Sequence, residues 1–222
     1  RDGPVSVEAA EVVDAKQVVD AEGVADTPVF GRLPVPDGAA VGCFCESDAV
    51  YDSFDDGDFA RHAEGSGCVY DNRTQRNAIR KIKVKHDGEY LCFLLRTKQP
   101  VTPYDGTGSW MRLYLNTTGG QGYQFVLNTH PAPDGTTTLA RVTGTDDDLT
   151  AADLPDVAAF YEADGDKFKI KVPLRALGLD PDGFTVWFKA ADSREPIASV
   201  EDFYDKGDVA PLGRMNFVYR GK

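Results

Sequence analysis

The chain is poor in the residues that perform redox, metal and nucleophilic chemistry. Its 222 residues include three histidines, four cysteines, two methionines and two tryptophans. It contains no G-x-S-x-G, H-E-x-x-H, P-loop or dinucleotide-binding motif. A glycosidase needs a pair of carboxylates, but the 36 acidic residues are too many to single out one pair. The sequence therefore favours a protein that is not an enzyme, with catalysis as a minor alternative.

Long apolar runs and an excess of cations are missing as well. No stretch of about 18 apolar residues occurs, so no membrane-spanning helix is expected. The formal net charge of −12 opposes binding to nucleic acid or to a membrane of anionic lipid. The acidity suits neutral or cationic ligands or calcium, although solubility alone would also explain it. The start at Arg1, without a signal-peptide pattern, is expected for a piece of a longer, processed protein.

The four cysteines do not form a metal-binding pattern. Cys43 and Cys45 are separated by one residue rather than two, and no Cys/His cluster with zinc spacing follows. Cys92 lies in an apolar segment and is expected to be a buried thiol. A disulfide from Cys43 or Cys45 to Cys68 is one option; it would close a loop of roughly 25 residues and contribute about 3 kcal/mol.

Alternating apolar and polar residues dominate the chain from residue 78 onward. Asp87-Gly88 is a strong hairpin signal, and other Gly, Pro and Asp turns separate the alternating segments. The strands predicted in this way are 79–85, 90–97, 109–116, 123–128, 138–142, 158–162, 168–172, 184–190 and 215–220. About ten strands at this spacing predict an all-β fold, an antiparallel β-sandwich with long loops and at most one or two short helices.

The chain is long enough for one large β domain. Residues 1–45 are expected to supply short strands and a connection to the sandwich, and residues 46–222 to form the rest of it. Residues 45–77 are polar and rich in Gly and Asp. They are expected to form a long loop with a functional or metal-binding role.

Two short helical segments are predicted. The acidic stretch 145–158 is expected to hold a short helix capped by Thr150 or Asp153. Pro173 and Gly178 bracket a sequence that predicts a single helical turn, because Pro favours the start of a helix and Gly its end.

One predicted strand, S-W-M-R-L-Y-L-N at 109–116, has two chemically different faces. Alternation places Met111, Leu113 and Leu115 on one face, and Trp110, Arg112, Tyr114 and Asn116 on the other. The first face suits a protein core. The second combines two aromatic rings, a guanidinium and an amide, which suits a flat polar ligand such as a sugar.

Six motifs follow one another from Tyr70 onward: N-x-T-x-R-N (72–77), W-M-R-L-Y-L-N (110–116), G-Y-Q-F-V-L-N (122–128), V-P-L-R-A-L-G-L (172–179), F-K-A-A-D (188–192) and D-F-Y-D-K-G-D-V-A-P-L-G-R-M-N-F-V-Y (202–219). In this order they resemble the carbohydrate-binding-module-9-like, DOMON-type β-sandwiches. The version they resemble is an accessory domain at the ends of large bacterial carbohydrate-active proteins. The resemblance covers roughly the last two-thirds of the chain, and its last motif is the most specific.

The resemblance implies a jelly-roll-like sandwich, usually with calcium, that in well-studied relatives holds a sugar between two tryptophans. It also implies a secreted bacterial parent protein, hence an extracellular or cell-surface location and neighbouring domains as partners. The chain departs from the family at Ala190, where Trp is more usual, and at Ser193, where Asn is more usual. Some DOMON relatives bind haem through Met and His, but no His is expected opposite Met111 or Met215, so no haem is predicted.

Seven residues form the candidate carbohydrate-binding set: Trp110, Arg112, Tyr114, Asn116, Trp187, Lys189 and Arg214. Trp110 and Trp187 are expected to face outward and stack on a pyranose, while the polar members bind its hydroxyls. The alternative is that both tryptophans pack beneath the N-terminal segment or another domain. Arg214 has its own alternative, a structural ion pair with Asp208 or Asp192.

Calcium ligands are predicted in the segment D-S-F-D-D-G-D. Asp52, Asp55, Asp56 and Asp58 offer hard oxygen ligands, and Gly57 permits a tight turn. The spacing differs from that of an EF-hand loop. A second candidate is the run of acids at 146–148, and solvated loop acids are the alternative for both.

The sequence thus predicts a non-catalytic, carbohydrate-binding accessory domain stabilised by calcium. A purely structural domain that packs on a catalytic neighbour is the main alternative. Exposure of the two tryptophans separates the two hypotheses, because binding needs a groove that both rings share.

Overall fold

The computed structural model describes residues 12–14, 49–52, 59–62, 69–72, 76–119, 122–145, 148–204, 206–213 and 215–222. For 12–14, 59–62 and 69–72 the backbone alone is described. Every strand pair among these residues is antiparallel, and the two helices among them are single 3-10 turns, η1 (Leu174–Leu177) and η2 (Glu201–Tyr204). The predicted all-β class is therefore confirmed.

Twelve of the strands form one hydrogen-bonded sheet, and β3 (Phe59–His62) and β4 (Val69–Asn72) form a second, two-stranded one. The order along the large sheet is β1-β14-β12-β7-β8-β9-β10-β11-β6-β5-β2, with β13 paired to β12. Its strands are β1 (Val12–Asp14), β2 (Ala49–Asp52), β5 (Ile79–His86), β6 (Tyr90–Thr97), β7 (Ser109–Asn116), β8 (Phe125–Leu127), β9 (Thr136–Val142), β10 (Ala151–Asp164), β11 (Lys167–Pro173), β12 (Phe184–Ser193), β13 (Asp208–Ala210) and β14 (Met215–Gly221).

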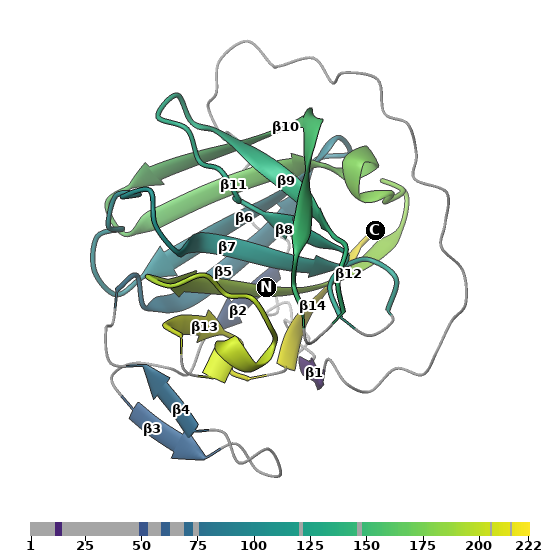
Figure 1. The fold of residues 1–222 in the computed structure, drawn as a ribbon. Helices are drawn as coiled ribbons and strands as arrows, with labels where there is room; N and C mark the ends of the chain where they lie inside the picture. The colour runs from purple at the N-terminus through teal and green to yellow at the C-terminus, as the bar shows by residue number, and fades with distance from the viewer. Residues whose placement is uncertain are drawn as a thin grey trace, which may run out of the picture.

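The large sheet curls, so that strands far apart in its order approach each other (Figure 1). Tyr51 Oη of β2 donates a hydrogen bond to the carbonyl of Val218 in β14, at 2.5 Å. The ring of His86 in β5 is hydrogen-bonded to Tyr219 Oη, also in β14, at 2.7 Å. These contacts give a curled half-barrel, and the division into the two sheets of a sandwich stays a prediction.

The inner face of the curl is filled by a large apolar cluster, here called the inner cluster. Phe93 of β6 and Phe188 of β12 contact each other across it, with ring centroids 5.2 Å apart, although their strands are not neighbours in the sheet. The alternation predicted for β11 holds, since Phe168, Ile170 and Val172 are fully buried in this cluster. Each such side chain contributes about 1.5–3 kcal/mol on burial.

A second cluster lies on the opposite, outer face of β7, β8 and β12, and is here called the outer cluster. Residues 194–204, with η2, cover this face. The buried members are Tyr114, Tyr123, Val126, Leu149, Ala191, Ile197, Val200, Phe203, Tyr204 and Val209. The central strands are therefore covered on both faces, although their outer-face residues include polar ones.

Most predicted strands are confirmed, two of them (90–97 and 109–116) at both predicted bounds, and so is the helical turn bracketed by Pro173 and Gly178. Gly178 has φ 71°, the left-handed conformation that favours glycine at a helix end. The helix predicted within 145–158 is wrong, because β10 begins at Ala151. Its strand tolerates Pro155 because the pairing with β9 shifts register between Asp153 and Ala158.

The long loop predicted at 45–77 is also wrong in part, because β2, β3 and β4 lie within it. Cys92 was expected to be a buried thiol; it is buried, but it is disulfide-bonded. Cys43, Cys45 and Cys68 lie outside the described residues, so the predicted pairing of these three is not tested. Within the ranges given above, no helix is long and apolar enough to cross a membrane.

Candidate functional site

The site begins with an irregularity in β7 that the sequence pattern did not reveal. Arg112 pairs with Ala191 of β12 and Ser109 pairs with Ser193, so Trp110 and Met111 together oppose the single residue Asp192. This is a β-bulge, and Met111 has the positive φ of 44° that accompanies it. The extra residue changes the alternation, so that Trp110 and Met111 both enter the inner cluster.

Trp110 is therefore a core residue, which corrects the prediction that it faces solvent. It is 3% exposed, and its ring packs edge-on against Tyr161 and Phe168. Its indole Nε1 donates to the carbonyl of Thr102 at 2.7 Å. A ring with both faces packed and its donor satisfied cannot stack on a sugar.

Trp187 is partly exposed on the outer face of β12, where it lies opposite Asn116. A Cβ at Gly119 would lie 3.0 Å from its ring, so the turn after β7 packs against the indole. Asn116 is six residues from Trp110 along β7, a separation of roughly 20 Å. The two tryptophans lie far apart and on different faces, so they do not share a groove.

Two polar members of the predicted set have structural roles. Asn116 is 3% exposed; its amide donates to the carbonyl of Gly122 at 2.7 Å, and its Oδ1 accepts from the backbone of Thr118 and Gly119. Lys189 is fully buried beneath Phe203, and its ammonium nitrogen donates to the carbonyl of Pro211. Burial holds the pKa of Lys189 well below its usual value.

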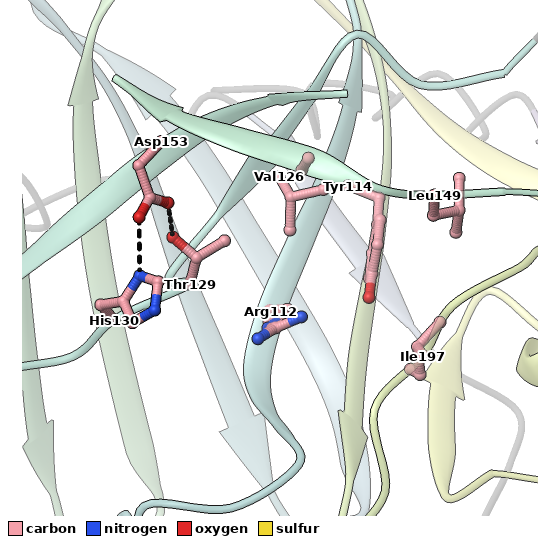
Figure 2. A pocket seen from close by; sticks show the side chains of 9 residues that line it. Arg112, Tyr114, Val126, Thr129, His130, Leu149, Asp153 and Ile197 are labelled. Atoms are coloured by element: carbon pink, nitrogen blue, oxygen red, sulfur yellow. Dashed lines mark hydrogen bonds and ion pairs between the residues drawn. The ribbon is translucent and has the colours of Figure 1, made fainter. Parts of the chain in front are cut away.

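Arg112 and Tyr114 are brought together as predicted, in a pocket of about 180 Å³ on the outer face (Figure 2). Regular alternation after the bulge places both side chains on the outer face of β7. The lining residues are Arg112, Tyr114, Val126, Thr129, His130, Leu149, Ala151, Asp153 and Ile197, which come from β7, β8, β10 and the loops that follow β8, precede β10 and follow β12. The pocket thus has aliphatic walls with a small number of polar groups.

Two polar atoms of this pocket, Arg112 Nε and Tyr114 Oη, are buried and make no hydrogen bond of good geometry in the described part of the chain, although Ser109 and Arg112 lie close to the Tyr114 hydroxyl. Tyr114 is only 1% exposed, and burial raises the pKa of its hydroxyl above the usual value. An unsatisfied buried polar atom costs about 1–3 kcal/mol. Such atoms on a pocket wall are what a polar ligand would satisfy.

Asp153 organises the other side of the pocket. Its carboxylate accepts from Thr129 Oγ1 at 3.1 Å and pairs with His130 Nδ1 at 3.1 Å. Figure 2 shows both interactions, with the guanidinium of Arg112 apart from them. The side chains of His130 and Asp153 are 69% and 42% exposed, so they form the rim of the pocket. His130 was not singled out from the sequence, and Asp153 was given only as one of two possible helix caps.

Arg214 lies outside the described residues, so neither of its predicted roles is tested. Asp192, one of its predicted partners, accepts from Arg76 Nε at 2.6 Å, Asn77 Nδ2 at 3.0 Å and the Met111 backbone at 3.1 Å. Burial raises the pKa of the Asp192 carboxyl, although Arg76 and these other donors act in the opposite direction. Asp208 likewise accepts from the backbone of Ile79. These contacts hold the chain before β5 and the start of β5 to β12, β7 and β13.

The predicted calcium ligands are represented by Asp52 alone, since Asp55, Asp56 and Asp58 lie outside the described residues. Asp52 Oδ1 is 3.2 Å from Lys81 Nζ, and its side chain is 66% exposed. In the parts of the chain that are described, no group of three or more His, Cys, Asp or Glu side chains is arranged to hold a metal. Asp52 by itself does not fit a calcium site, so calcium stays a prediction.

The chain was compared with protein families, curated proteins and solved structures. No family model, no curated protein and no solved structure matches it.

Proposed function

We propose that this protein is a non-catalytic carbohydrate-binding domain that holds one sugar unit in the pocket of Arg112 and Tyr114. The observation that carries the proposal is the pair of buried, unpartnered polar atoms, Tyr114 Oη and Arg112 Nε, on the wall of a cavity. A bound hydroxyl would satisfy either atom and recover the free energy that their burial costs.

The size and lining of the pocket favour a small polar ligand. Its 180 Å³ lies below the ~300–1,000 Å³ of pockets that take drug-sized molecules, which suits a single ring. Leu149, Ile197 and Val126 offer apolar contact to the C–H face of a pyranose. The ligand in this proposal is therefore the end of a glycan chain, bound without the tryptophan stacking first predicted.

The family resemblance supplies the rest of the proposal. It implies a jelly-roll-like sandwich, an accessory role beside a catalytic domain, and a secreted bacterial parent protein. The alternative is a structural domain without a ligand, which the burial of Trp110 favours. A third possibility is catalysis by the His130–Asp153 pair. It has no support, because no nucleophile among the described residues is hydrogen-bonded to His130.

A glycan array followed by titration calorimetry tests the proposal. The protein is expected to bind at least one glycan, and Tyr114→Phe is expected to weaken that binding several-fold. Tyr123→Phe is the matched control, because Tyr123 lies in the same cluster but not on the pocket wall. If the array is blank, or if Tyr114→Phe retains full affinity, the pocket is not the binding site.

Calcium is tested separately by thermal melting with and without a chelator. A metal that binds only the folded protein raises its stability by about 2.7 kcal/mol at a hundredfold excess over Kd. A melting temperature that does not change on chelation would remove calcium from the proposal.

A further inference from the structure

The pocket contains one charge that has no counter-charge. In the described part of the chain, Arg112 forms no ion pair, and its Nε is buried without a partner. Among the described lining residues only Asp153 carries a carboxylate, and this carboxylate is already bound to His130 and Thr129. A guanidinium is charged at every physiological pH, so Arg112 places a permanent positive charge in the cavity.

The pocket also offers more hydrogen-bond donors than unoccupied acceptors, which favours the same kind of ligand as its positive charge. Arg112 presents only donors, and the hydroxyl of Tyr114, which Ser109 and Arg112 approach, can also donate. The strongest acceptor, the Asp153 carboxylate, is occupied by two donors. A neutral sugar hydroxyl needs both a donor and an acceptor, whereas a carboxylate accepts only.

From this imbalance we propose that the pocket recognises a carboxylated sugar, a uronic acid at the end of a glycan chain. The carboxylate pairs with the guanidinium of Arg112 and accepts a hydrogen bond from Tyr114 Oη. Arg binds carboxylates through parallel N–H···O bonds that are stronger than neutral ones. This inference rests on the proposed function, because it specifies the sugar that the same pocket binds.

The acidity of the whole chain does not oppose this contact strongly. The net charge of −12 is spread over 222 residues, and at physiological salt it is screened over a length of about 8 Å. Arg112 would touch the ligand directly. The electrostatic energy of the bound carboxylate is therefore determined by the pocket. The net charge of the protein slows the approach of the ligand instead.

The experiment compares charged and neutral forms of the same sugars. Titration calorimetry is performed with disaccharides of glucuronic, galacturonic, mannuronic and guluronic acid, each beside its methyl ester. At least one acid is expected to bind about tenfold or more tightly than its ester. Cyclohexanecarboxylate, a carboxylate on a ring without hydroxyls, is expected to bind much more weakly than that acid.

Charge substitutions supply the second part of the test. Arg112→Gln is expected to lower the affinity for the acid about tenfold or more and the affinity for the ester much less, because only the acid loses a charge pair. Asp153→Asn is expected to raise the affinity for the acid, because it removes a like charge. Arg175→Gln changes the net charge equally in η1, outside the pocket lining, and is expected to have no effect. Thermal melting of each variant verifies that it is folded.

The outcomes separate the two proposals. If neutral glycans bind and the acids bind no better than their esters, the uronic acid inference fails and the carbohydrate function stands. If cyclohexanecarboxylate binds as tightly as the acid sugar, the site is a general carboxylate site and both proposals fail. If no glycan, charged or neutral, binds, both fail as well.

Discussion

The inner and outer faces of the central strands bury side chains to a similar extent but satisfy their polar atoms differently. On the inner face, Trp110 Nε1 donates to Thr102, and Tyr51 Oη donates to Val218. On the outer face, Tyr114 Oη and Arg112 Nε are buried without partners. Unsatisfied atoms also occur at the inner face, since Arg141 Nε, beside Phe125 of the inner cluster, and Arg76 Nη2 are buried without partners among the described residues; the two outer-face atoms differ in that they line the pocket.

This difference separates residues that stabilise the fold from residues available for recognition. Burial alone does not separate them, since Trp110 and Tyr114 are both nearly inaccessible. For these two residues hydrogen-bond satisfaction does, because a fold gains nothing from an unpaired hydroxyl. The predictions below test this distinction, from the largest expected effect to the smallest.

The two tryptophans provide the most direct comparison. Trp110→Ala is expected to lower the free energy of unfolding by about 3–5 kcal/mol, because it leaves a cavity in the inner cluster. Trp187→Ala removes a partly exposed ring and is expected to cost about 1 kcal/mol. Urea denaturation measures both. Equal losses would mean that side chains on the outer face contribute as much to stability as those on the inner face.

The next prediction concerns the buried ion pair between Arg76 and Asp192, at the edge of the inner face. Asp192→Asn keeps an acceptor for Asn77 and Met111 but leaves the Arg76 guanidinium without a counter-charge, at a cost of about 3 kcal/mol. Adding Arg76→Met is expected to recover part of that loss. Chemical denaturation of the four proteins gives the coupling energy. Strict additivity would show that the two charges do not stabilise each other.

Lys189 tests the outer face through the pH dependence of stability. Its pKa is lowered by burial, so below its usual value of 10.5 the unfolded chain binds a proton that the folded chain does not. Stability therefore rises with pH in the window between the lowered pKa and 10.5, by up to about 1.4 kcal/mol per pH unit. The comparison is made below pH 10, since the raised pKa of Tyr114 acts in the opposite direction above it.

Replacing Lys189 by Met is expected to flatten this slope, whatever its effect on stability at neutral pH. Urea denaturation at several pH values measures the slope for both proteins. An unchanged slope in Lys189→Met would show that this lysine is protonated in the folded protein.

The smallest expected effects come from two tyrosines of the outer cluster, whose rings lie 5.5 Å apart. Tyr123→Phe removes a hydrogen bond to Asn216 Oδ1 and is expected to cost about 1–3 kcal/mol. Tyr114→Phe removes a hydroxyl without a partner and is expected to leave stability unchanged or slightly higher. Thermal melting compares them. A large loss in Tyr114→Phe would show that its hydroxyl is satisfied inside the fold.

Sequence patterns predicted the regular part of the fold well. Alternation in β11, the Asp87-Gly88 turn between β5 and β6, and the end of η1 at Gly178 depend on neighbouring residues alone, so a local pattern reveals them. The helix predicted near residue 150 failed because tertiary pairing with β9 determines that segment. No local pattern carries that information.

The candidate site was predicted only in part, for a similar reason. Arg112 and Tyr114 were placed together correctly because they are two residues apart on one strand. Trp110 was misplaced because the bulge depends on Asp192, which is 81 residues away and accepts from the Met111 backbone. His130 and Asp153 were missed because they meet only once β8, β9 and β10 are paired.

The extra residue in β7 links two properties that are usually independent. It lets an indole complete the interior at one end of the strand and, from the next residue onward, presents a guanidinium and a phenol to the opposite side. Removing Met111 would leave Trp110 opposite Asp192 and Arg112 opposite Ala191, so simple alternation would keep the indole inside and the cation outside. The cost of that deletion would fall on the interior, which would lose the buried Met111 side chain, and on Asp192, which would lose the Met111 backbone donor.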